Sequence, residues 1–74
     1  MDMVSKILIF RTSISKKQDI KLIAKVLNKC TQIENWNVDF EDWEKVLRIE
    51  CHNMNAIQIA AILREIGIYA EELE

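Results

Sequence analysis

The chain of 74 residues contains no proline and a single glycine, Gly67. Flexible linkers depend on such residues, so we expect regular elements joined by short turns, and no linker. The two cysteines, Cys30 and Cys51, are too few and too far apart for a disulfide framework, and we expect both to be reduced thiols. The sequence therefore predicts one small domain, residues 1–74, that must use nearly every apolar face to build its core.

An excess of positive charge and long apolar runs are also absent. Ten basic and twelve acidic residues give a formal net charge of -2 and are mixed along the chain, which argues against binding to nucleic acid. No apolar run is long enough to cross a bilayer, and residues 1–6 lack the features of a signal peptide. We therefore expect a cytoplasmic protein that makes no contact with membranes.

The first half of the chain has the hydrophobic pattern of a strand followed by that of a helix. Residues 4–10 are apolar and β-branched, which is typical of a strand. Ser15 and Gln18 then fit a capping box, in which the two side chains bond free backbone N–H groups at a helix start. The helix is expected to end near residue 29 or 30, and its apolar positions are Ile20, Ile23, Ala24 and Leu27.

A hairpin is expected next. Trp36, Val38 and Phe40 alternate with polar residues, which gives a strand one dry face and one wet face. The polar residues 41–44 form the expected turn. A second alternating strand follows, and its inward residues are Leu47, Ile49 and Cys51.

The last third of the chain predicts a helix and a strand. Asn53 or Asn55 is expected to cap the helix, and Gly67 to end it, because glycine tolerates the positive φ of many helix C-termini. Residues 68–72 or 73 form the last strand. The order β-α-β-β-α-β predicts an α+β ferredoxin-like fold, a four-stranded antiparallel sheet with two helices on one face. The predicted core consists of Leu8, Phe10, Leu27, Val38, Phe40, Leu47, Ile49, Ile59, Leu63 and Ile66.

Nearly the whole chain resembles the heavy-metal-associated domains of copper chaperones and metal-transporting P-type ATPases. The resemblance rests on the apolar pattern of residues 20–27, on Asn-Val-Asp-Phe at 37–40, and on Gly-Ile-Tyr-Ala-Glu at 67–71. In that family two thiolates bind Cu(I). They belong to a Cys-x-x-Cys loop between the first strand and the first helix. Carried over by position, those cysteines fall near Lys16 and Asp19. The resemblance therefore implies the fold, and it implies that the family's metal site is absent.

Soft ligands are expected at the opposite end of the sheet. Cys30, Cys51 and His52 could form a relocated metal site there, with Met3 and Met54 nearby. The interpretation we favour is that both cysteines pack as small hydrophobic residues. We therefore expect no metal and no other cofactor.

An enzyme is not expected. A catalytic Cys-His pair needs the base beside the nucleophile and a third group that orients it, whereas adjacent strand residues such as Cys51 and His52 point to opposite faces. The acidic residues at 41, 42 and 44 lack the spaced ligands and the glycine of a calcium loop. They are expected to form a solvated turn.

Successive side chains of a strand point to opposite faces of a sheet, and this strand parity predicts an apolar patch on the helix-free face. A patch of this kind, with charged residues at its rim, is typical of an association surface. Trp43, in the adjoining turn, is either an exposed binding anchor or a lid over the core. The predicted interaction face consists of Ile7, Ile9, Val46, Arg48, Tyr69 and Trp43.

These observations predict a non-enzymatic interaction module that contacts a protein partner, or a second copy of itself, through the open sheet face. Two alternatives remain. One is a copper carrier or sensor that uses Cys30, Cys51 and His52. The other is a small-molecule-binding regulatory domain, although the chain has no glycine-rich ligand loop.

Overall fold

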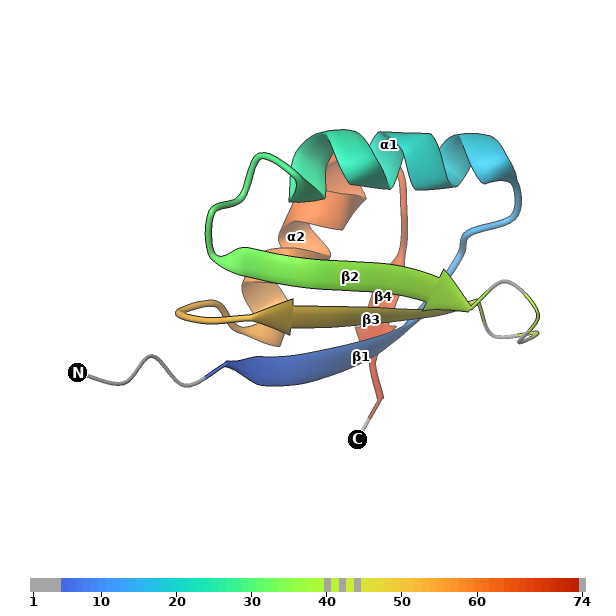
Figure 1. Cartoon of the computed structure of the whole chain (residues 1–74). Coiled ribbons are helices and arrows are strands. Elements are labelled where there is room, and N and C mark those ends of the chain that lie inside the picture. The colour runs from blue at the N-terminus through green and yellow to red at the C-terminus, as the bar shows by residue number, and fades with distance from the viewer. Residues whose placement is uncertain (1–4, 40, 42, 44, 74) are drawn as a thin grey trace.

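The computed structural model of the chain describes residues 5–39, 41, 43 and 45–73. Its elements are β1 (Lys6–Thr12), α1 (Lys17–Leu27), β2 (Ile33–Asp39), β3 (Val46–Cys51), α2 (Ala56–Glu65) and β4 (Ala70–Glu72). The strands form one antiparallel sheet in the order β2-β3-β1-β4. Both helices cover the same face of this sheet (Figure 1). The predicted ferredoxin-like fold is confirmed.

The first strand extends further than residue 10, where the sequence placed its end. Arg11 and Thr12 belong to β1 because they pair with Glu71 and Ala70 of β4. The Thr12 side chain is buried, and its hydroxyl donates to the carbonyl of Lys45 at 2.6 Å. Residue 4, the predicted start, lies outside the described residues. Pairing with a distant strand, rather than local polarity, sets the end of β1.

The N-terminus of α1 differs from the predicted capping box. Lys16 is the N-cap in place of Ser15, and the residue three positions on is Asp19 in place of Gln18. The Asp19 carboxylate accepts hydrogen bonds from the backbone N–H groups of Ser15 and Lys16 at 2.9 and 3.3 Å. A charged acceptor is stronger than an amide, and a negative charge is favourable at a helix N-terminus. α1 ends at Leu27, earlier than predicted.

The hairpin follows the predicted alternation. Trp36 lies opposite Ile49, and Val38 lies opposite Leu47. The two β3 residues are fully buried, whereas Trp36 and Val38 are half-buried against the core. Phe40, also predicted in the core, lies outside the described residues.

β2 forms one edge of the sheet, and Trp36 fixes it in two ways. The backbone N–H of Trp36 donates to Oδ1 of Asn35 at 2.9 Å. The indole Nε1–H donates to Oδ1 of Asn28, the residue that follows α1, at 3.1 Å. The edge strand is therefore tied to the helix above it.

The N-terminus of α2 has the predicted kind of cap. Asn55 is the N-cap rather than Asn53; its Oδ1 accepts from the Gln58 N–H at 2.8 Å, and Gln58 Oε1 accepts from the Asn55 N–H at 2.9 Å. Gly67, two residues beyond the helix, has φ +82°, which confirms the reason for a glycine there. β4 (Ala70–Glu72) is shorter than predicted.

The core lies between the sheet and the two helices. Most of the predicted core residues are buried, and Val38 and Ile66 lie half-buried at its border. Ile14 and Ile68 are buried although they lie in connections, where hydrophobic periodicity carries no signal. The buried residues are Leu8, Phe10, Thr12, Ile14, Ile23, Leu27, Leu47, Ile49, Cys51, Met54, Ile59, Leu63 and Ile68.

Candidate functional site

The helix-free face of the sheet carries the side chains that strand parity assigned to it. Across β1 and β3, Ile7 pairs with Glu50 and Ile9 pairs with Arg48. Ile7 is 59% exposed, and Arg48 is also exposed. Ile9, Glu50 and the neighbouring Val46 are half-buried. The placement agrees with the predicted parity, whereas a role for these residues in association stays a prediction.

A further apolar residue reaches this face from the C-terminal end of the chain. The backbone N–H of Leu73 donates to the carbonyl of Ile9 at 2.7 Å, so the pairing of β4 with β1 continues one residue past Glu72. Alternation then places the half-buried Leu73 beside Ile9 on the open face. Leu73 was not among the residues predicted for this face. It lies at the end of the strand, where too few residues follow to show an alternating pattern.

Tyr69 is separated from the other apolar residues of the face. Arg11 and Glu71 pair across β1 and β4, with 3.6 Å between the guanidinium and the carboxylate, and they stand between Ile9 and Tyr69. The backbone N–H of Tyr69 donates to Ser13 Oγ at 2.9 Å, and its carbonyl accepts from the Ser13 N–H at 3.0 Å. The predicted contiguous patch is therefore wrong for Tyr69, which is an exposed aromatic residue beside the β1–α1 loop.

Two depressions open to solvent lie on the outer side of β2 and β3. The smaller one has a volume of about 70 Å³ and the wider one about 510 Å³. Asn37 and Arg48 line both, so the two depressions adjoin and form one concave surface. The smaller depression is lined by Ile7, Asn35, Trp36, Asn37, Arg48 and Glu50. The wider one is lined by Asn37, Val38, Asp39, Val46 and Arg48.

Trp43 lies in the β2–β3 connection with 81% of its surface exposed. It does not cover the core, so the interpretation of Trp43 as a lid is wrong. It lies outside the sheet, and its role as a binding anchor stays a prediction. The acidic residues 42 and 44 on either side of it lie outside the described residues.

The β1–α1 loop is organised by one carboxylate. Asp19 accepts hydrogen bonds from the Ser15 N–H, from the Ser15 hydroxyl at 3.3 Å and from the Lys16 N–H. These bonds, the one from the Ser15 backbone above all, lower the pKa of Asp19 below its ordinary value. Residues 13–19 contain no sulfur. The loop therefore offers a hard carboxylate and an ammonium group, and these do not fit a soft ion such as Cu(I).

The opposite end of the sheet contains Cys30, Cys51 and His52, as the topology predicted. The His52 N–H donates to the carbonyl of Gln32 at 2.9 Å, which brings the end of β3 beside the chain that follows α1. Cys51 is fully buried, and burial raises the pKa of its thiol. Cys30 donates its S–H to the carbonyl of Val26, with 3.5 Å between sulfur and oxygen.

His52 has a carboxylate partner of its own. Its Nδ1 lies 2.9 Å from Oε2 of Glu34, and the same oxygen accepts from the hydroxyl of Ser5 at 2.8 Å. These two contacts lower the pKa of Glu34. Among the described residues no group of three His, Cys, Asp or Glu side chains could hold a metal ion. Met3 lies outside the described residues, and Met54 is buried in the core. The described residues therefore do not assemble the relocated site.

No family model and no curated protein match the sequence, and among the described residues no helix is long and apolar enough to cross a membrane. Solved structures do match. The apo form of the HMA domain of the copper chaperone for superoxide dismutase aligns with a TM-score of 0.82 and 14% identity, over 100% of this chain and 72% of that chain. A yeast copper transporter domain, solved in apo and Cu(I)-loaded states, aligns with a TM-score of 0.78 and 14% identity, over 92% of this chain and 94% of that chain. The resemblance to heavy-metal-associated domains is thus confirmed in the fold, which this chain shares with them.

Proposed function

We propose that this chain is a non-enzymatic interaction domain that associates weakly with a second copy of itself through the open face of its sheet. The observation that carries the proposal is the exposed Ile7 on one of the two central strands, beside the concave surface around Arg48. Burial of a large aliphatic side chain contributes about 1.5–3 kcal/mol. Ile7, Ile9 and Leu73 are the apolar groups that such a contact would remove from water.

The charges on the face favour a second copy as the occupant. Arg48 and Glu50 lie on the same face of β3, two residues apart. In a two-fold interface a surface meets itself, so the Arg48 guanidinium of one copy can pair with the Glu50 carboxylate of the other, twice. The pairs would fix the orientation of the two sheets more than they would add affinity.

The size of the face predicts a weak complex. β1, β2 and β3 have six or seven residues each and β4 has three; at about 4.8 Å between strands and roughly 3.3 Å per residue, the face measures at most about 19 by 23 Å. Stable interfaces bury about 800 Å² on each partner. The sheet face is smaller than that, so we expect a transient dimer.

Copper transport is less well supported as a function. The comparison proteins are a copper chaperone and a copper transporter domain. The β1–α1 loop, where the resemblance to heavy-metal-associated domains implies two thiolates, holds Asp19 and Lys16 instead, and the thiol of Cys51 is buried. Affinity for a soft metal comes mainly from accessible thiolates.

Sedimentation over a range of concentrations tests self-association. We expect reversible dimerisation that Ile7→Lys abolishes, because a lysine there places a charge at the centre of the contact. Ile57→Lys is the matched control: Ile57 is 80% exposed on α2, away from the sheet. A chain that stays monomeric at all concentrations, or equal loss of dimer in both variants, would contradict the proposal.

Competition against a Cu(I) chelator under reducing conditions tests the rival function. We expect the chelator to take all the copper. Tight, stoichiometric retention of Cu(I) that disappears in Cys51→Ser would instead favour a carrier built on the cysteines.

A further inference from the structure

Positive charge is concentrated on α1 and its two flanking turns. Residues 16–29 contain five lysines and one aspartate, a net charge of +4, whereas the rest of the chain carries five basic and eleven acidic residues, a net charge of -6. Over the whole chain these charges nearly cancel, to a net charge of -2. The fold separates them, because α1 lies on one side of the sheet and most acidic residues lie in strands and their connections.

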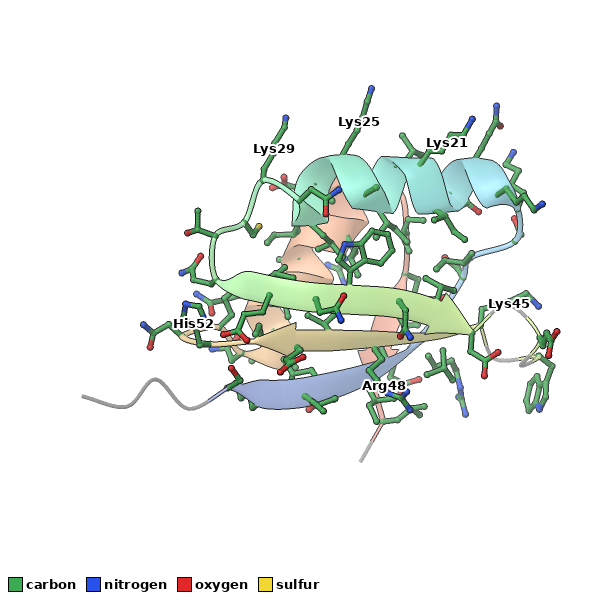
Figure 2. All side chains as sticks on the ribbon, viewed as in Figure 1. Lys21, Lys25, Lys29, Lys45, Arg48 and His52 are labelled. Atoms are coloured by element: carbon green, nitrogen blue, oxygen red, sulfur yellow. The ribbon has the colours of Figure 1, made fainter. Side chains whose placement is uncertain are left out.

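Three of these lysines lie on the outer side of α1, and a fourth follows its C-cap. Lys17, Lys21, Lys25 and Lys29 are spaced by four residues, and all are exposed. This row lies opposite the helix face that buries Ile23 and Leu27. Figure 2 shows Lys21, Lys25 and Lys29 pointing away from the sheet. With a rise of about 1.5 Å per residue, the part of the row that lies on α1, from Lys17 to Lys25, is about 12 Å long. We call Lys17, Lys21, Lys25 and Lys29 the lysine row.

No ion pair with another described residue neutralises the lysine row. In the part of the chain that the structure describes, the ion pairs are those of Arg11 with Glu71 and of His52 with Glu34, and no further interaction involves the four ammonium groups. Four like charges on one helix face repel each other and reduce helix stability slightly. An external anionic surface would remove that cost.

The sequence predicted no contact with membranes, and the concentration of charge on α1 revises that expectation. We propose that the lysine row binds the surface of a bilayer that contains anionic phospholipid. Successive lysines of the row are offset by only about 40° around the helix, so neighbouring ammonium groups can reach a flat surface together. Leu22, which is 41% exposed and follows Lys21, lies at the side of the row and can enter the interface. The acidic remainder of the molecule would face away from the bilayer, so binding also orients the open sheet face toward solvent.

The choice of lysine favours a lipid surface over an acidic protein. Lysine acts as a point charge, whereas arginine recognises carboxylates with a fixed two-pronged geometry. The chain has three arginines, and residues 16–29 contain none of them. A diffuse layer of headgroups needs no fixed geometry, and each basic residue near such a surface contributes about 1 kcal/mol, or about fivefold in binding.

Co-sedimentation of the full chain with phosphatidylcholine vesicles, with and without phosphatidylserine, tests this proposal. We expect binding to the anionic vesicles only, lost near 1 M salt, where the screening length falls to about 3 Å. Lys21→Glu/Lys25→Glu should weaken binding by at least about 25-fold. The matched control, Lys6→Glu/Lys45→Glu, changes the net charge equally but leaves α1 intact, and it should bind within a few fold of the original chain.

Three results would overturn the proposal. One is equal binding of the original chain to neutral and anionic vesicles, or binding to neither. The second is equal loss of binding in the two double variants, which would mean that net charge rather than the lysine row decides. The third is binding to soluble polyglutamate or RNA but not to vesicles, which would assign the row to an acidic macromolecule. Circular dichroism of both double variants is the control for their folding.

Discussion

A helix begins at each end of the sheet, and different kinds of side chain cap the two helix N-termini. At the end with the β1–α1 loop, the carboxylate of Asp19 holds the turn into α1. At the other end, the neutral pair Asn55 and Gln58 caps α2, next to Cys51 and His52. Residues 13–19 at the first end contain no sulfur, whereas at the second end Cys51 is buried and Cys30 donates its S–H to the Val26 carbonyl. The comparison teaches that one scaffold can start its two helices with different acceptors, a carboxylate at one end and a neutral amide pair at the other.

The largest expected change in stability is at Cys51, and it should distinguish the buried thiol from that of Cys30. Cys51→Ser places a hydroxyl in the apolar core and should lower the free energy of unfolding by about 1–3 kcal/mol. Cys30→Ser should change it by less than about 0.5 kcal/mol, because Cys30 is half-buried and a serine hydroxyl can also donate to the Val26 carbonyl. Urea unfolding of both variants measures this. Equal losses would mean that Cys51 is not a core residue.

The neutral cap of α2 should contribute the same stability at acidic and at neutral pH. Asn55→Ala removes the acceptor of the Gln58 N–H, and the expected loss is about 0.5–2 kcal/mol. No charged group takes part in this cap, so the loss should be the same at acidic and at neutral pH. Urea unfolding at both pH values checks it, and a loss that depends strongly on pH would break the comparison between the helix starts.

The smallest effect is expected at Asp19, and it should depend on pH. The pKa of Asp19 is lower in the folded chain than its ordinary value, so the unfolded chain binds the proton more tightly. The stability from this carboxylate is therefore present above its ordinary pKa and disappears as the pH falls through the lowered, folded value. Melting temperatures of the original chain and of Asp19→Asn should differ at neutral pH and converge in acid. Convergence at neutral pH instead would show that the carboxylate does not hold the loop.

The fold follows from local patterns that need no knowledge of distant partners. Leu47 and Ile49 alternate with polar neighbours, and Gly67 marks a position that requires positive φ. These signals are read within a few residues, and the compact order of elements leaves few topologies. The sequence therefore predicts the sheet, the helices and most of the core.

The candidate site depends on register, which periodicity does not give. Tyr69 has the predicted parity, yet the pairing of Arg11 with Glu71 separates it from Ile9. The sequence fits a capping box of Ser15 and Gln18, whereas in the structure the Asp19 carboxylate bonds the N–H groups of Ser15 and Lys16. The lysine row becomes a cluster only when α1 is separated from the strands and connections that contain most of the acidic residues.

The hydrogen bond between Asn35 and the backbone of Trp36 has a consequence for how the protein can assemble. An exposed edge strand is a template on which another chain can add a strand, and repeated addition produces fibrils. In β2 the Asn35 side chain already takes the Trp36 N–H, and the indole is anchored to Asn28. A strand that docked there would have to displace the bond between Asn35 and the Trp36 N–H. Growth along the β2 edge is thereby discouraged, which is consistent with the proposed face-to-face contact, because that contact closes after two copies.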